Sequence, residues 1–215
     1  MRSSILIFVF SCVLVACRGT RQPKSDGWIS LFDGKSLSGW RVGSNAATFS
    51  VENGSIVAHG PVAHLFYVGG VQQHQFKNFE FKAEVMTTPG SNSGIYFHTS
   101  YQDSSWPSKG YEVQVNNSHT DWRRTGSLYA IQDVREVYVK DNEWYTEKII
   151  VQGKRVTIMI NDKTVVDYTE PEKVERPRGM SERFISSGTF ALQGHDPQSK
   201  VYFKNIYVKP LPDGN

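Results

Sequence analysis

The sequence predicts an all-β fold, an antiparallel sandwich or barrel. Short runs that alternate apolar and polar residues recur along the chain, and Gly, Pro, Asn-Gly or Asn-Asp separate them. No long apolar stripe with the 3.6-residue period of a helix follows residue 26. No internal repeat is visible either. We therefore expect one domain made of strands, at residues 27–211.

The start of the chain predicts a bacterial lipoprotein signal at residues 1–16. A positive residue precedes an apolar run, residues 5–15, that is too short to cross a bilayer as a helix. Small residues then lead to Cys17, which we expect to become the lipid-bearing first residue. Ordinary secretory cleavage nearby is the alternative. The polar residues 17–26 predict a flexible tether. We therefore expect a lipid-anchored protein of the bacterial cell envelope, periplasmic or on the cell surface.

Cysteine and charge exclude several kinds of site. The chain has two cysteines, and Cys12 lies inside the apolar run, so only the acylated Cys17 would remain after processing. The domain is thus predicted to have no disulfide and no cysteine-metal site. The formal net charge is +3, with Lys and Arg scattered along the chain. This pattern excludes a nucleic-acid groove and favours a sugar or another neutral ligand.

The strands can be assigned in order. Asn53-Gly54 readily adopts the positive φ values of a type I′ turn, so it predicts a hairpin of residues 48–51 and 55–58. Residues 79–85 alternate apolar side chains with Glu and Lys, which predicts one buried and one solvated face. Further strands are expected at residues 92–98, 110–117, 144–151, 155–160, 164–169, 188–193 and 201–208.

Two irregular features are expected near the end of the chain. Residues 170–187 are rich in charge, Pro and Gly, which predicts a long surface loop. In the last strand the apolar phase shifts from Val201 and Phe203 to Ile206 and Val208. A β-bulge at Lys204-Asn205 would explain this shift.

Two predicted strands carry polar rows that point to a site. In residues 110–117 every second side chain is apolar, and the intervening ones are Glu112, Gln114 and Asn116. In the upstream strand, Tyr96 and His98 oppose two apolar side chains. If both strands belong to one sheet, a carboxylate, a carboxamide and an imidazole line one open surface. The alternative is the solvated outer face of a sandwich.

Several nearby residues could contact a ligand. Trp106 lies in a connection between strands, where its ring could stack on a sugar or simply cap the edge of the core. Asp121 and Arg124 lie in a turn and could bind a ligand or form a surface ion pair. His98 and His195 could act as a base or a metal ligand, or merely be hydrogen-bonded. No compact metal motif is present, and no Gly-x-Ser-x-Gly elbow.

Five motifs in family order resemble the 3-keto-disaccharide hydrolase family, within the concanavalin-A-like lectin and glucanase superfamily. They are Leu31-Phe32-Asp33-Gly34 with Gly39-Trp40, Asn92-Ser93-Gly94-Ile95-Tyr96-Phe97, Gly110-Tyr111-Glu112-Val113-Gln114-Val115, Thr125-Gly126-Ser127-Leu128-Tyr129 and Leu192-Gln193-Gly194-His195-Asp196. The resemblance implies a jelly roll of two packed antiparallel sheets, with the ligand on the concave sheet. It also implies action on sugars oxidised at carbon 3. The motif residues carried over are Glu112, Gln114, Arg124, Tyr129 and His195, whereas His98 stands where family members commonly have arginine.

The carboxylates favour elimination over double displacement. A retaining glucanase needs two carboxylates about 5 Å apart, but here Glu112 is followed on the same face by Gln114. We expect Glu112 or His98 to act as the base, and Arg124, His195 or a divalent cation to hold the developing oxyanion. A cation would bind Glu112, His98 and His195. The substrate-binding residues are expected to be Tyr96, Trp106, Gln114, Asp121, Arg124 and Tyr129. A non-catalytic carbohydrate-binding lipoprotein is the alternative function.

Overall fold

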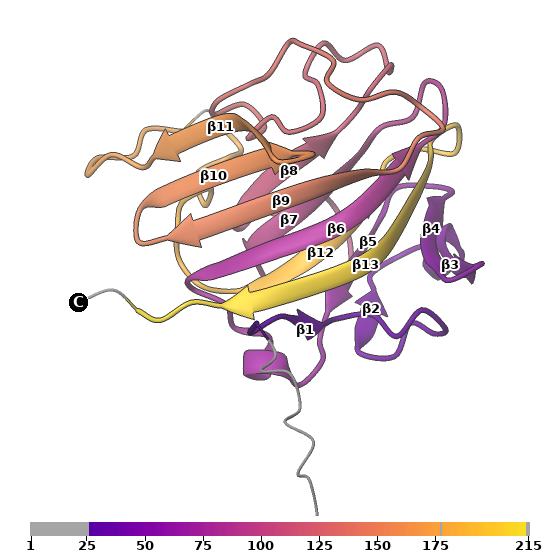
Figure 1. Ribbon diagram of the computed structural model, residues 1–215, viewed down its shortest axis with the longest axis horizontal. Coiled ribbons are helices and arrows are strands. Elements are labelled where there is room, and N and C mark those ends of the chain that lie inside the picture. Colours follow the sequence, from indigo (N-terminus) through magenta and orange to yellow (C-terminus); the bar gives the residue numbers. More distant parts are fainter. Residues whose placement is uncertain (1–25, 177, 214–215) are drawn as a thin grey trace, which may run out of the picture.

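The protein is a sandwich of two antiparallel β-sheets (Figure 1). This computed structural model describes residues 26–176 and 178–213, so the predicted signal, most of the tether and Cys17 lie outside the described residues. None of the helices in the described part is long and apolar enough to cross a bilayer. The all-β prediction is confirmed.

The larger sheet has eight strands in the order β11-β10-β9-β6-β13-β4-β3, with β1 paired to β13. Its strands are β1 (Ile29–Ser30), β3 (Phe49–Glu52), β4 (Ser55–His59), β6 (Phe79–Thr87), β9 (Tyr145–Gln152), β10 (Arg155–Ile160), β11 (Lys163–Thr169) and β13 (Lys200–Pro210). Figure 1 shows β9, β6 and β13 side by side across one layer. The hairpin at Asn53-Gly54 and the meander β9-β10-β11 are confirmed.

The smaller sheet has five strands in the order β2-β5-β12-β7-β8. They are β2 (Trp40–Val42), β5 (Ala63–Tyr67), β7 (Ser93–Thr99), β8 (Tyr111–Val115) and β12 (Thr189–Gly194). Two short 3-10 helices, η1 (Ala46–Thr48) and η2 (Val71–His74), lie in the connections. The two predicted polar strands, β7 and β8, are therefore neighbours in one sheet, with Tyr96 directly opposite Glu112.

The core between the sheets is built from alternating apolar side chains. Phe190 of β12 packs against Phe76, Phe79 and Phe81, with ring centroids 4.6 to 4.9 Å apart. Such aromatic pairs add to the stabilisation from apolar burial. In β6 every second side chain is buried, as the alternation predicts.

The expected bulge in β13 is present. The register with β6 shifts between Lys204 and Tyr207, and Asn205 has a φ of 49°. The stretch after β11 is a loop, as expected, but it is not confined to the surface. Glu170 and Arg183 are 8% and 7% exposed, because ion pairs and hydrogen bonds draw them inward.

The outer edge of β8 is covered by the segment Gly126–Tyr129. The amides of Gly126 and Tyr129 donate hydrogen bonds to the carbonyl oxygens of Gln114 and Glu112, and the amide of Gln114 donates to Ser127. Val113 and Leu128 form a bridge. Strand β8 is thus held on both edges, which fixes the backbone that carries Glu112.

Candidate active site

A cavity of about 340 Å³ lies on the face of the smaller sheet that points away from the core. Its floor is formed by β7, β8 and β12, because their non-core side chains alternate onto this face. Loops supply its walls. The lining residues are Asn92, Tyr96, Trp106, Pro107, Ser108, Glu112, Gln114, Asp121, Tyr129, Gly179, Met180, Arg183, Gln193 and His195.

A glycine makes room for the carboxylate on this floor. Gly94 of β7 lies beside Gln114 of β8, and a Cβ at Gly94 would be 2.8 Å from Oε1 of Glu112. This separation is shorter than ordinary contact, so a side chain at Gly94 would displace Glu112. The close approach of the Glu112 side chain to the backbone therefore explains why this motif position is a glycine.

Glu112 is a buried carboxylate with polar partners on both oxygens. Oε1 accepts a 3.0 Å hydrogen bond from Nε2 of Gln193, and Oε2 lies 3.5 Å from Nη2 of Arg183. Both side chains of the ion pair are less than one-tenth exposed. Burial raises the pKa of Glu112 above its usual range, while Arg183 and Tyr96 pull it down less strongly. A raised pKa suits a group that exchanges a proton near neutral pH.

Two amides offer free acceptors in the same region. Gln114 donates to Oδ1 of Asn92 at 2.9 Å, and Gln193 also donates to Oη of Tyr96 at 3.0 Å. The Oε1 atoms of Gln114 and Gln193 are buried and have no hydrogen-bond partner among the described residues. Buried polar atoms are normally paired, so these two acceptors suit the hydroxyl groups of a ligand.

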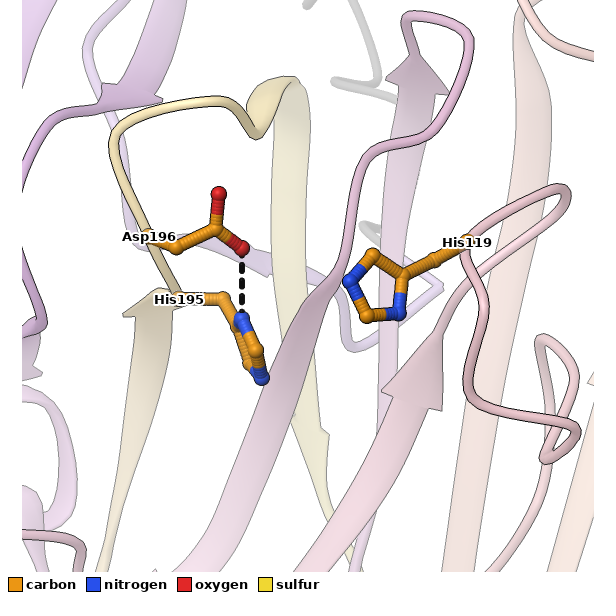
Figure 2. A group of neighbouring side chains, drawn as sticks. All are labelled: His119, His195 and Asp196. Atoms are coloured by element: carbon orange, nitrogen blue, oxygen red, sulfur yellow. Dashed lines mark hydrogen bonds and ion pairs between the residues drawn. The ribbon is translucent and has the colours of Figure 1, made fainter.

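His195 forms a hydrogen-bonded pair with the next residue in the chain. Its Nδ1 is 2.7 Å from Oδ2 of Asp196, as Figure 2 shows. Partial burial opposes ionisation of Asp196, but hydrogen bonds from His195 and Ser199 outweigh it and hold the pKa of Asp196 below its usual range. The carboxylate therefore fixes a proton on Nδ1 and turns Nε2 of His195 outward, toward the cavity that His195 lines.

The residues that could bind a metal differ from the predicted set. The ligand atoms of His119, His195 and Asp196 lie within 4.8 Å of one another, and Figure 2 shows the His119 ring directed toward His195. The predicted set of Glu112, His98 and His195 is not the group that the structure brings together.

His98 lies away from the cavity. The register between β7 and β12 shifts near this residue, and His98 has a φ of 55°, so a bulge interrupts the alternation that predicted its direction. Its Nε2 lies 2.9 Å from the carbonyl oxygen of Lys77, and its Nδ1 accepts from the amide of Ser186 at 3.2 Å. Burial lowers the pKa of His98 to about 4. The prediction that His98 shares the site with Glu112 is therefore wrong, because the His98 side chain lies outside the cavity.

Arg124, a predicted substrate-binding residue, does not line the cavity. Its side chain holds the loop in which it lies. Its Nη1 donates to the carbonyl oxygens of His119 and Asp121 and to Oδ1 of Asn116, at 2.7 to 3.1 Å. Arg183, which was not among the predicted site residues, reaches the cavity instead. Its loop carries no strand pattern, so only the folded contacts reveal it.

The remaining predicted ligand-binding residues do line the cavity. Trp106 is 46% exposed, and its ring centroid lies 5.5 Å from that of His195. The ring of Tyr129 forms cation–π contacts with the guanidinium groups of Arg123 and Arg183. Asp121 forms an ion pair with Arg123 at 3.5 Å. Gln193 was missed, although its alternation with Phe190 and Leu192 could have placed it on the outer face.

The family model of the 3-keto-alpha-glucoside-1,2-lyase-like domain matches residues 27–209. A 3-keto-disaccharide hydrolase from Bacteroides thetaiotaomicron is 30% identical over 233 aligned residues, which cover 87% of this chain and 79% of that protein.

Solved structures share the fold. A candidate glycosyl hydrolase from Parabacteroides distasonis superposes with a TM-score of 0.72 at 24% identity, covering 86% of this chain and 94% of that one. The carbohydrate-binding module CBM66 from Bacillus subtilis gives a TM-score of 0.55 at 15% identity, covering 80% and 95%. A non-specific endo-β-1,3(4)-glucanase, SCLam, gives 0.54 at 12% identity, covering 86% and 91%. With its fold shared by glycosyl hydrolases and a carbohydrate-binding module and its sequence matched over nearly the whole domain, the chain belongs to the 3-keto-disaccharide hydrolase family of glycoside-cleaving enzymes.

Proposed function

We propose that this enzyme cleaves glycosides whose sugar is oxidised at carbon 3, by elimination across carbons 1 and 2 followed by hydration. The observation that supports this most is the buried carboxylate on the cavity floor, Glu112, which has Arg183 at 3.5 Å and an amide, Gln114, at the next position on the same face. The family match supports the substrate class.

The first step takes a proton from carbon 2. A ketone at carbon 3 acidifies that hydrogen, and Glu112 accepts it. The electron pair of the C–H bond moves into an enolate whose charge lies on the carbon 3 oxygen. Arg183 is the cation nearest to Glu112, so it can hold that oxyanion while Glu112 works on the adjacent carbon.

The second step breaks the bond from carbon 1 to the leaving oxygen. The enolate electrons form a carbon 1–carbon 2 double bond, and the leaving oxygen must receive a proton. His195 is the pocket group placed to give it, because the Asp196 carboxylate accepts the Nδ1 proton in a hydrogen bond and orients the ring at the cavity. Addition of water to the resulting enone, with its proton returned to carbon 2, gives the free 3-keto sugar.

His119, His195 and Asp196 do not fit a cation site with three protein ligands, because existing hydrogen bonds already engage His119 and Asp196. Nδ1 of His119 accepts from the amide of Asp121 at 3.1 Å and lies 3.3 Å from Nδ2 of Asn92. The proton of neutral His119 is therefore on Nε2, so that nitrogen has no lone pair for a metal. Asp196 is occupied by His195 and Ser199.

We further propose that Cys17 is lipidated and that the enzyme acts in the bacterial cell envelope. The sequence pattern of residues 1–26 supports this proposal.

The function is tested by incubating the protein with a 3-keto-glucoside and with its parent glucoside, and analysing the products by mass spectrometry. We expect release of the leaving group from the 3-keto-glucoside alone. Glu112→Gln should reduce turnover by about 100- to 10,000-fold, because it removes the base and keeps the shape. Glu172→Gln is the matched control, since this exposed carboxylate forms an ion pair with Lys154 at the surface. Binding of the sugar without turnover would instead support the carbohydrate-binding alternative.

A further inference from the structure

The loop between β11 and β12 sends two arginines to opposite sides of β8. Arg183 lies on the cavity side, with Nη2 3.5 Å from Oε2 of Glu112. Arg176 lies on the other side, where its Nη2 donates a 2.6 Å hydrogen bond to Oη of Tyr111. Tyr111 and Glu112 are consecutive in a strand, so their side chains point to opposite faces. One loop therefore contacts both faces of the strand that carries the proposed base, Glu112.

A buried ion pair fixes the loop backbone on either side of Phe184. Nε of Arg176 donates to the carbonyl oxygen of Arg183 at 2.6 Å, and Oε2 of Glu170 accepts from the amide of Ile185 at 2.9 Å. Oε2 of Glu170 lies 3.4 Å from Nη2 of Arg176, and both side chains are 8% exposed. The backbone from which the Arg183 side chain extends is therefore held at both ends by one pair of charges.

We propose that Arg176, together with Glu170, is a positioning residue that holds Arg183 against Glu112 from the far side of β8. This inference rests on the proposed function, in which Glu112 takes the proton and Arg183 holds the ketone oxygen. Loss of one partner of a buried ion pair leaves the other charge uncompensated, so the loop must rearrange. The guanidinium of Arg183 would then lose its fixed place in the cavity.

The effect should be visible in the ionisation of Glu112. Besides Arg183, the titratable groups that face Glu112 are Tyr96 from β7, Tyr129 from the loop after β8 and His195 after β12. In the described residues Arg176 hydrogen-bonds to none of these three side chains. Arg176 does contact Tyr111, the neighbour of Glu112 in β8, as well as the backbone of Arg183, and a double variant at residues 176 and 183 separates these two routes. Since Arg183 favours the ionised carboxylate, its displacement raises the pKa of Glu112.

The test compares Arg176→Ala and Arg176→Lys with Arg183→Ala and with the Arg176→Ala, Arg183→Ala double variant. Turnover of the 3-keto-glucoside is measured from pH 4 to pH 9, and thermal denaturation checks folding. Arg155→Ala is the control, because Arg155 forms an ion pair with Asp167 at the surface of the adjacent hairpin.

We expect Arg176→Ala to lower kcat by about 100-fold, the order of loss that follows displacement of a catalytic group by about 1 Å. The acid limb of the rate profile should move to higher pH. Arg176→Lys should recover part of the rate, because it keeps the charge. In the double variant, Arg176→Ala should add nothing to the loss caused by Arg183→Ala. The control should match the wild type.

Two results would overturn the inference: an unchanged acid limb in folded Arg176→Ala, or losses that multiply in the double variant. If Arg176→Ala does not fold, Arg176→Lys and Glu170→Gln carry the same comparison. A wild-type protein that does not turn over the 3-keto-glucoside would refute the proposed function separately. An NMR titration of the Glu112 carboxyl carbon then tests the positioning role without turnover, and an identical titration in wild type and Arg176→Ala would refute it.

Discussion

Replacement of Glu147 by leucine should stabilise this protein at neutral pH. Glu147 is fully buried on the inner face of the larger sheet, with neither carboxyl oxygen hydrogen-bonded to any described residue. Its cross-strand neighbours are Ala83 and Ile160, both buried and apolar. Burial raises the pKa of Glu147 well above its usual range. Folding therefore disfavours the ionised form of this carboxyl group relative to the unfolded chain.

The magnitude follows from linkage between protonation and folding. The folded pKa of Glu147 is raised, so the folded state loses stability as the pH rises above the unfolded pKa, about 4.3, toward the folded one. Each pH unit in that window costs about 1.4 kcal/mol. An unpaired buried polar group costs about 1 to 3 kcal/mol more. After some loss from imperfect packing, we expect Glu147→Leu to gain about 3 kcal/mol, or about 6 to 12 °C in Tm for a domain of this size.

The assay is urea denaturation of wild type, Glu147→Leu and Glu147→Gln at intervals from pH 4 to pH 8. The wild type should lose stability relative to both variants as the pH rises through this window. Glu147→Gln separates the two contributions, because it cannot ionise but keeps an unpaired polar group. Parallel stability curves for wild type and Glu147→Gln would refute the reasoning, since they would mean that Glu147 has the same pKa in both states.

Three further predictions concern the site and the compartment. Asp196→Asn should reduce kcat by about 100-fold or more, because His195 loses the carboxylate that fixes its tautomer and ring orientation; steady-state kinetics on the 3-keto-glucoside measure this, and wild-type kcat would contradict it. Exhaustive chelation should leave turnover unchanged, because the His119 tautomer disfavours a cation; activity restored only by added metal would show otherwise. Mass spectrometry of the mature protein should find acylated Cys17 at the amino terminus, and an unmodified terminus elsewhere would defeat the anchor.

Alternation made most of the fold predictable from sequence. Strand β8 shows why: a two-residue period assigns Val113 to the core and Glu112 to the outer face, and both assignments hold because the strand is regular. The Asn53-Gly54 turn was predictable for a similar reason, since few residue pairs adopt its backbone angles. Alternation and turn preferences therefore predict the structure correctly where the backbone is a regular strand or a standard turn.

The site was less predictable because two of its features depend on departures from these rules. His98 was assigned to the site by alternation, but a bulge with a positive φ redirects it. Arg183 lies in a loop without periodicity, and a buried ion pair formed by distant residues draws it in. The bulge at Lys204-Asn205 is visible in the sequence as a shift of the apolar phase, but the one at His98 is not. A long-range ion pair leaves no clear pattern in a single sequence.

The segment Gly126–Tyr129 that covers β8 also has a consequence for self-association. An exposed edge strand offers unpaired amides and carbonyls that can template pairing with another chain. Here the strand that carries Glu112 would be such an edge, but the backbone groups of Glu112 and Gln114 on that edge are satisfied by Gly126, Ser127 and Tyr129 of the same chain. Variation in this covering segment would therefore affect solubility as well as the pocket, because the site and the protection against intermolecular strand pairing depend on the same few hydrogen bonds.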